Sequence, residues 1–325
     1  MNTKRTGMFL INAIFVSLVF AIPVWATDDY PSKPIQIVTV FTAGGALDVS
    51  TRIISEKMAG YLKQSVLVLN KVGGGGALGT AHVAASKPDG YTLLTVPPTH
   101  VSLPLINRNL PYKASDFIPV GRYLTFYQYV MVNKDLPVRT LDELIGHAKK
   151  NPGTLSYSTS GFGGNTHLLT ELLKLNRQID LQYVPSAGEF PATTALVGNH
   201  VQVAVLGLPT AQAHIKSGAI RAIVVLSTKR DPVYSQIPTS VEQGFTDLIN
   251  TGYFVLLAPA KIPSQILSKL ESALERAVQD KGVQEAFRKM DSTADFQNSR
   301  DTQAMLDSEV KRWSQIVKKV GIMSK

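Results

Sequence analysis

Residues 35–48 read IQIVTVFTAGGALD, and this stretch decides the fold. Its first seven residues are mostly β-branched or apolar, a pattern typical of a short strand. Thr42, Ala43 and the glycine pair that follows break the strand, and residues 49–62 then have apolar side chains at helical spacing. The stretch therefore predicts a strand, a glycine loop and a helix in that order.

The same unit recurs twice along the chain. Its other copies are a strand, loop and helix at 65–69, 73–76 and 77–85, and again at 155–158, 161–164 and 166–175. Strands that alternate with helices at this spacing form βαβ units, in which a parallel sheet is covered on both faces. The predicted fold class is therefore α/β with mostly parallel sheets.

The length of the chain indicates two lobes. It has 325 residues, and chains above roughly 250 residues tend to divide into two cores. Three long amphipathic helices are predicted near the C-terminus, at 266–278, 283–290 and 301–320. They exceed what the second lobe needs, so we expect them to pack on the first lobe.

The chain is expected to cross between the two lobes twice. Lobe I is predicted to comprise residues 27–126 and 251–325, and lobe II residues 127–250. The crossings then fall near 124–130 and 248–254. Two crossings form a double hinge, around which two lobes can close on a ligand.

The N-terminus has the features of a cleavable secretory signal peptide at residues 1–26. Lys4 and Arg5 precede an apolar run at 8–22, and cleavage is expected after Ala26. The run is shorter than the roughly 20 unbroken apolar residues of a membrane anchor. The chain has no Cys, so it has neither a lipid acceptor nor disulfides. We therefore expect an exported, soluble protein of the periplasm.

Composition and spacing exclude several classes of function. The formal net charge is +9, but the basic residues are scattered, which does not favour a nucleic-acid partner. The six His residues lack paired ligand spacing, so no metal is expected. No nucleophile elbow or spaced pair of carboxylates is present, and we expect no enzyme.

The second glycine loop resembles a dinucleotide fingerprint without its partner. Gly74, Gly76 and Gly79 match G-x-G-x-x-G, but no carboxylate follows about 20 residues later. No Lys follows as in a P-loop either. We therefore expect no cofactor.

The three glycine loops are candidates for binding an anion. Loops beyond the carboxyl ends of strands carry ligands in open α/β sheets, and helix N-termini favour negative charge. The alternative is that the loops are ordinary tight turns. Asp48 likewise has two interpretations, a helix cap or a partner for a ligand amine. Neutral hydrogen-bonding groups near these loops are Thr42, Thr99, Ser158, Ser160, Asn165 and Thr166.

The order of these motifs resembles the Bug/TctC family of periplasmic receptors of tripartite tricarboxylate transporters. The similar segments are 30–35 (YPSKPI), 41–48 (FTAGGALD), 70–76 (NKVGGGG), 88–94 (PDGYTLL), 157–167 and 237–245. The resemblance covers nearly the whole chain after residue 26. It implies a Venus-flytrap fold, a small carboxylate ligand and a membrane permease as partner, with a monomeric receptor.

The resemblance also implies a set of pocket residues. Carried over position by position, they are Thr42, Ala43, Gly44, Asp48, Thr99, Ser160, Asn165, Thr166 and Ala187, and Gly75 of the second loop is added as a candidate. The sequence departs from the family at Gly207, where members often have Asp, and at Tyr253, where they often have Trp. Glu189 introduces a negative charge near the expected cleft, or points to solvent.

Two alternatives to a transport receptor remain at this point. The first is a receptor that presents the closed, liganded form to a membrane sensor kinase, which differs in partner and not in pocket. The second is a periplasmic hydrolase or isomerase that uses Asp48 or Glu189, against which the missing catalytic spacing argues.

Overall fold

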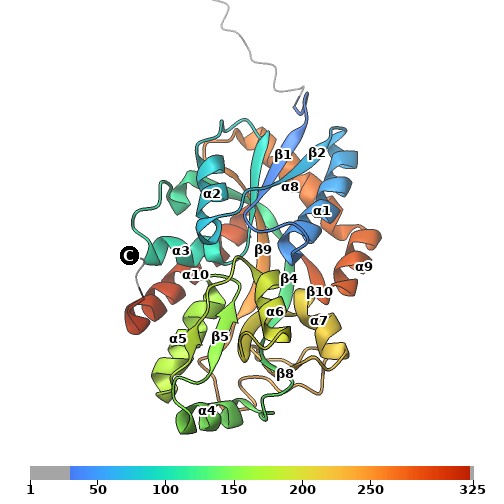
Figure 1. Cartoon of the computed structure of the whole chain (residues 1–325). Helices are drawn as coiled ribbons and strands as arrows, with labels where there is room; N and C mark the ends of the chain where they lie inside the picture. Colours follow the sequence, from blue (N-terminus) through green and yellow to red (C-terminus); the bar gives the residue numbers. More distant parts are fainter. Residues whose placement is uncertain (1–29, 323–325) are drawn as a thin grey trace, which may run out of the picture. The chain divides into compact units, whose positions relative to one another are not determined.

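The computed structural model describes residues 30–322 (Figure 1). The expected signal peptide at 1–26 lies outside the described residues. Residues from Pro31 onward form one compact unit. Within residues 30–322, no helix combines the length and the apolar character that crossing a membrane requires.

The predicted opening unit forms the first segment of a mixed sheet. Strand β1 (Ile35–Thr39) lies between β2 (Val66–Asn70) and β3 (Thr92–Val96), parallel to both. Strand β9 (Thr251–Pro259) then pairs antiparallel with β3. Ile35 and Ile37 are fully buried, because helices cover the sheet on both faces.

The long strand β4 (Phe117–Asn133) joins the two sheet segments. Its first part pairs with β9 and with β10 (Ser292–Gln297), and its last part from Gln128 pairs with β7 (Val203–Gly207) and β8 (Ile220–Val225). All these pairings are antiparallel. In the second segment, β5 (Ser156–Thr159) is parallel to β7 and to β6 (Gln182–Tyr183).

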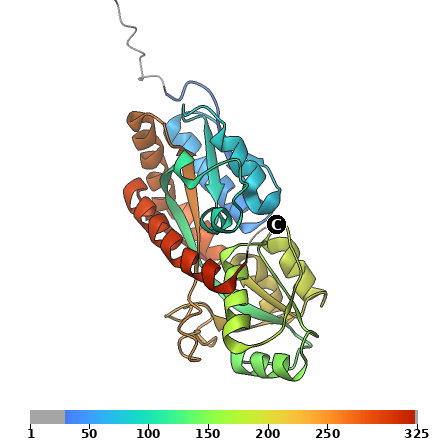
Figure 2. The same ribbon diagram turned by 90° about the vertical axis from the view of Figure 1, so that its left-hand side faces the viewer.

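Ten α-helices surround the two segments in the described part of the chain. They are α1 (Ala46–Leu62), α2 (Ala77–Ala84), α3 (Thr99–Ile106), α4 (Leu141–Lys150), α5 (Asn165–Arg177), α6 (Glu189–Val197), α7 (Leu208–Lys216), α8 (Ser264–Gln279), α9 (Lys281–Lys289) and α10 (Ser299–Val320). The last of them, α10, packs on α3 and β4 and also reaches α5 of the second segment (Figure 2).

The α/β fold class and the two-lobed architecture are confirmed, and two elements are additions to the prediction. Helix α3 follows Pro97 and Pro98 and contains Pro104, and these residues indicate a loop in the sequence. Pro98 is the N-cap residue of α3, where a proline interrupts no helical hydrogen bond. The buried face of α3 packs on α10. Strand β10 has few buried side chains, so its pattern is weak. Strand β4 continues through Pro119 because the register shifts there.

Candidate functional site

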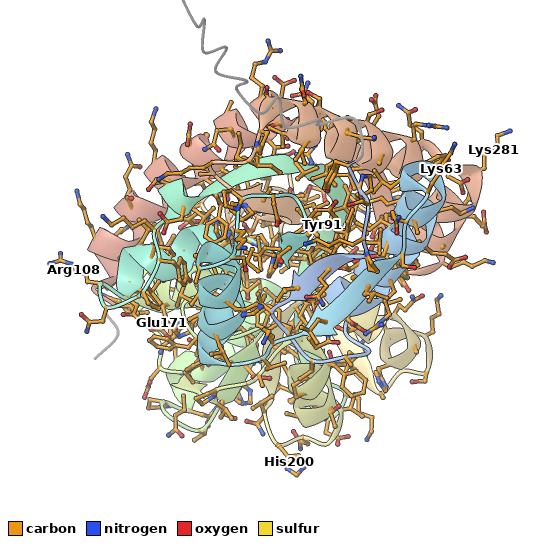
Figure 3. All side chains as sticks on the ribbon, turned by 90° about the horizontal axis from the view of Figure 1, so that it is seen from above. Lys63, Tyr91, Arg108, Glu171, His200 and Lys281 are labelled. Carbon is orange, nitrogen blue, oxygen red and sulfur yellow. The ribbon has the colours of Figure 1, made fainter. Side chains whose placement is uncertain are left out.

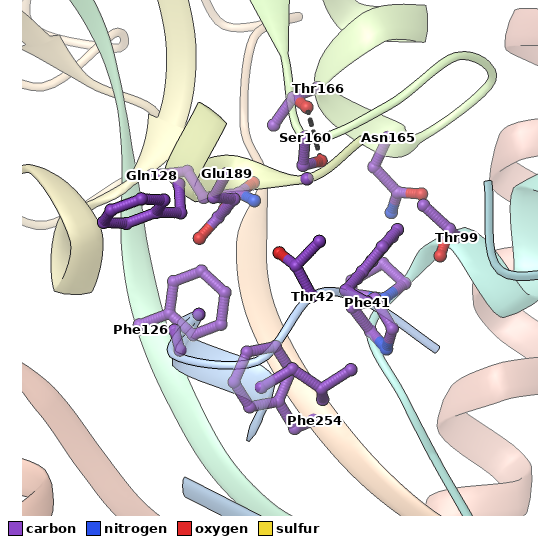
Figure 4. Close-up of a pocket in the computed structure, with 17 residues that line it drawn as sticks. Phe41, Thr42, Thr99, Phe126, Gln128, Ser160, Asn165, Thr166, Glu189 and Phe254 are labelled. Atoms are coloured by element: carbon purple, nitrogen blue, oxygen red, sulfur yellow. Dashed lines mark hydrogen bonds between the residues drawn. The ribbon is translucent and has the colours of Figure 1, made fainter. Parts of the chain in front are cut away.

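A cavity opens where loops from both sheet segments meet (Figure 4). It contains about 550 Å³ of space between atoms, part of which is open solvent. Its lining consists of Phe41, Thr42, Gly45, Ala46, Leu47, Pro97, Pro98, Thr99, Phe126, Gln128, Ser160, Asn165, Thr166, Gly188, Glu189, Phe190 and Phe254. The structure thus brings together six predicted residues, namely Thr42, Thr99, Ser160, Asn165, Thr166 and Glu189.

Four helix N-termini meet at this cavity. The lining includes the first residues of α1, α3, α5 and α6. The first turn of a helix leaves N–H groups without a partner inside the helix, and four such turns adjoin this one cavity. None of the residues that line the cavity is Lys, Arg or His. Lys63, Arg108 and Lys281 point outward instead (Figure 3).

Asp48 holds the first glycine loop from inside and does not line the cavity. Its carboxylate accepts the Gly44 N–H at 3.0 Å and the Asn70 amide at 2.9 Å, and pairs with Arg52 at 2.9 Å. Burial by itself raises the pKa of Asp48, but the hydrogen bonds from Arg52, Gly44 and Asn70 outweigh it and hold the pKa below its usual value. Asp48 is not the helix cap that the sequence offered, because the N-cap residue of α1 is Gly45 and no side chain caps it. Both oxygens of Asp48 are engaged by Gly44, Asn70 and Arg52, which does not favour a ligand amine as their partner either.

Ala43 and Gly44 also lie outside the cavity lining. Both residues are exposed to solvent in the first loop. Gly75 and Ala187 line a neighbouring cavity, together with Phe41 and Phe162. The second glycine loop therefore packs against the third loop, where a Cβ on Gly75 would lie 3.5 Å from the Phe162 carbonyl oxygen. Of the eleven residues predicted for the pocket, six therefore line the cavity and five lie outside its lining, namely Ala43, Gly44, Asp48, Gly75 and Ala187.

One end of the cavity is a cluster of neutral hydrogen-bonding groups. The Ser160 and Thr166 hydroxyl oxygens are 3.3 Å apart. With its amide placed to satisfy both neighbours, Asn165 donates to the Pro98 carbonyl oxygen at 3.3 Å and accepts from Trp313 Nε1 at 3.0 Å. Asn165 therefore links α5 to the residues before α3 and to α10. Hereafter the hydroxyl end means Thr99, Ser160, Asn165 and Thr166.

The opposite end of the cavity is aromatic and acidic. Phe126 of β4 and Phe254 of β9 pack with ring centroids 5.1 Å apart, and Gln128 and Glu189 lie beside them (Figure 4). Glu189 Oε1 accepts the Gly207 N–H at 3.0 Å. Burial raises the pKa of Glu189 to about 7, against the smaller lowering effect of that hydrogen bond. Hereafter the aromatic end means Phe126, Gln128, Glu189 and Phe254.

The departure at Gly207 is explained by Phe126. A Cβ on Gly207 would lie 2.5 Å from Phe126 Cε2 and 3.0 Å from Glu189 Oε1. A Cβ on Gly252 would overlap the same ring. The Phe126 ring thus fills the place of a side chain at 207, and it requires glycine at both positions.

All four aromatic lining residues, Phe41, Phe126, Phe190 and Phe254, were absent from the predicted site. Phe41, Phe126 and Phe254 belong to apolar stretches of the sequence that resemble core. Phe126 and Phe254 do fall within or beside the expected crossings at 124–130 and 248–254, which was the one available signal. The other lining residues that the prediction omitted are Gly45, Ala46, Leu47, Pro97, Pro98, Gln128 and Gly188.

The histidine beside the third loop packs internally. His167 Nδ1 accepts the Gly163 N–H at 3.1 Å, and its ring packs against Tyr157 and Tyr183. Burial lowers the pKa of His167 to about 4. Among residues 30–322, no group of three or more His, Cys, Asp or Glu side chains is arranged to hold a metal ion.

Known proteins resemble the chain over nearly all of its length. BugT of Bordetella pertussis is 32% identical over 323 residues, which cover 98% of each chain. The structure of Rpa4515 of R. palustris with adipate has a TM-score of 0.86 at 29% identity and covers 91% of this chain and 99% of that one. MatC of Rhodopseudomonas palustris with bound malate has a TM-score of 0.82 at 27% identity, covering 89% and 100%.

A sequence model of the tripartite tricarboxylate transporter family receptor (TctC) matches residues 50–322. This match and the likeness to BugT confirm the resemblance to the Bug/TctC family. The chain therefore belongs to the TctC family of tripartite tricarboxylate transporter receptors, whose members bind substrates and are not enzymes.

Proposed function

We propose that this protein captures a small carboxylate in the cavity between its lobes and delivers it to a membrane transporter. The observation that carries the proposal is the meeting of four helix N-termini at a cavity whose lining has no basic side chain. Such an arrangement binds an anion through backbone N–H groups and the positive ends of helix dipoles.

The hydroxyl end is the proposed position of the carboxylate. Three of the four helix ends belong to α1, α3 and α5, and the Thr99, Ser160 and Thr166 hydroxyls lie beside them. A buried carboxylate loses its hydration, and hydrogen bonds from N–H and O–H groups to a charged acceptor compensate that loss. The proposed binding needs no covalent step.

Closure of the lobes is the proposed motion. We take the lobes to be those predicted from the sequence, residues 27–126 with 251–325 and residues 127–250; β4 and β9 span the two predicted crossings. Loops from both lobes contribute to the lining, since Thr42 and Thr99 come from one and Ser160 and Thr166 from the other. A ligand between them binds most tightly when the lobes are closed, and shifts the population toward that state.

The site of action is proposed to be the periplasm, reached through the signal peptide at 1–26. Family membership supports this location, because the family model describes receptors of a transporter. The relatives with adipate and malate support a carboxylate as the ligand class. A membrane permease is the proposed recipient of the ligand.

A thermal-shift screen tests the ligand class. Protein purified from a periplasmic extract would be unfolded, dialysed and refolded to remove bound ligand, and then heated with small carboxylic acids and with the matching primary amides. An acid at 100 times its Kd should add about 2.7 kcal/mol of stability and raise Tm by several degrees. The neutral amides should not. Equal shifts from acids and amides, or no shift from any acid, would overturn the carboxylate proposal.

Uptake measurements test the transport role. Whole cells should take up the identified acid, and deletion of the gene for this chain should abolish that uptake until the gene is restored. Unchanged uptake in the deleted strain would contradict a transport receptor while leaving the binding result intact.

A further inference from the structure

Glu189 is the one ionisable residue among the side chains that line the cavity. It is the first residue of α6, and Oε1 is fixed by the Gly207 N–H at 3.0 Å. The first glycine loop lies over this point, since a Cβ on Gly188 would be 3.9 Å from the Thr42 hydroxyl oxygen. One carboxylate oxygen is thus anchored, and the group as a whole faces the cavity (Figure 4).

No cation of the described chain compensates this carboxylate. Glu189 takes part in none of the ion pairs found within residues 30–322. Its environment raises its pKa to about 7 through burial, which shows that its charge is poorly solvated without a partner. A ligand that supplies a positive charge would remove that cost.

The rings around Glu189 suit the same ligand group. Phe126 and Phe254 are almost fully buried at this end, and Phe41 and Phe190 complete the aromatic lining. Aromatic faces attract an ammonium ion within about 6 Å of the ring centroid. A carboxylate beside phenyl rings is the arrangement that recognises an alkylammonium group, whereas a second ligand carboxylate would face like charge and rings without a donor cation.

We infer that the ligand is a monocarboxylate with an apolar body and a cationic amine at its far end, which lies against Glu189. This inference rests on the proposed carboxylate binding at the hydroxyl end and extends it to the aromatic end. It separates this chain from the relatives solved with adipate and malate, whose ligands carry a carboxylate at both ends.

The test compares ligands that differ only at the far end. One series is 6-aminohexanoate, hexanoate and adipate, and the other is 4-(aminomethyl)benzoate, 4-ethylbenzoate and 4-(carboxymethyl)benzoate. Calorimetric titration of the refolded protein at pH 7.5 should show the amine of at least one series binding about tenfold or more tightly than its two counterparts, as expected for a hydrogen-bonded charge pair.

Variants assign the preference to Glu189. The E189Q variant keeps an oxygen for the Gly207 N–H and should lose the tenfold preference for the amine, while its affinity for hexanoate or 4-ethylbenzoate stays within about twofold. Glu56→Gln, which removes an exposed charge on α1, is the matched control and should keep the preference.

The outcomes separate this inference from the proposed function. A dicarboxylate that binds as tightly as the amine, or a preference that survives in E189Q, would overturn the inference and leave carboxylate capture standing. Absence of binding by all six acids would overturn both.

Discussion

The two ends of the cavity recognise ligands by different means. The hydroxyl end depends on helix N-termini and short neutral side chains, which accept any carboxylate and depend little on the identity of single residues. The aromatic end depends on Phe126, Gln128, Glu189 and Phe254, whose shapes and single carboxylate discriminate between ligands. In one cavity, backbone groups can thus hold the chemical group that many ligands share, while side chains at the other end select among those ligands.

The largest effect at the aromatic end is expected from Gly207→Asp, which places an acid where the resemblance to the family implies one. The new Cβ would lie 2.5 Å from the Phe126 ring, and its carboxylate would be buried beside Glu189. We expect a loss of about 3 kcal/mol or more in the free energy of unfolding, from overpacking and an unpaired charge. Urea denaturation measures this loss.

Gly146→Asp on α4 is the control, because a Cβ there meets no atom within 4 Å. Its effect should stay below about 1 kcal/mol. Combining Gly207→Asp with Phe126→Ala should cost less than the sum of the single changes, since the ring is the obstacle. Equal free energies of unfolding for Gly207→Asp and Gly146→Asp would show that the Phe126 ring moves aside at little cost.

The charge at the aromatic end should make the ligand-free protein less stable as pH rises. In the unfolded chain Glu189 loses its proton near the usual pKa of 4.5, but in the folded chain near about 7. The folded state therefore holds more protons between these values, and stability falls across pH 4.5–7 by at most about 3 kcal/mol. The E189Q variant lacks this contribution, so the Tm advantage of E189Q over the unaltered protein should be larger at pH 8 than at pH 5. Parallel Tm curves would contradict the burial of a charge here.

At the hydroxyl end, Ser160→Ala should weaken all acids to a similar degree. Removing one hydrogen bond to a buried carboxylate costs about 1.5 kcal/mol, or roughly tenfold in Kd. Calorimetry with an amine-bearing and an apolar acid should show equal losses, in contrast to E189Q. Thr154→Val, which removes an exposed hydroxyl in a distant turn, should change neither affinity. A loss confined to one acid would mean that Ser160 belongs functionally to the aromatic end.

The hydroxyl end could be predicted from sequence because its residues follow strand ends, where topology gathers them. Ser160, Asn165 and Thr166 flank the third glycine loop, Thr99 follows the third strand, and the sheet brings these two places together. The aromatic end could not, because the space that Phe126 fills is defined by the missing side chains of Gly207 and Gly252. The hydrogen-bond partners of the Asp48 carboxylate could not be predicted either, since only the fold brings Asn70 and Gly44 to it.

The smallest expected effect comes from Trp313 of α10, which contacts the hydroxyl end through Asn165 and does not contact the aromatic end. Its Nε1 is 3.0 Å from the Asn165 amide oxygen and 2.7 Å from Glu309 Oε2. The single indole N–H is shared by these two acceptors. Trp313→Phe removes that N–H, whereas Glu309→Gln keeps an acceptor and the Asn165 contact. Loss of one neutral hydrogen bond costs about 1 kcal/mol, so Trp313→Phe should weaken every acid by about threefold to fivefold, measured by calorimetry. Because Asn165 is distant from Glu189 in the cavity (Figure 4), the ratio between amine-bearing and apolar acids should not change. If Glu309→Gln weakened the acids equally, the effect would come from α10 packing and not from the Asn165 link.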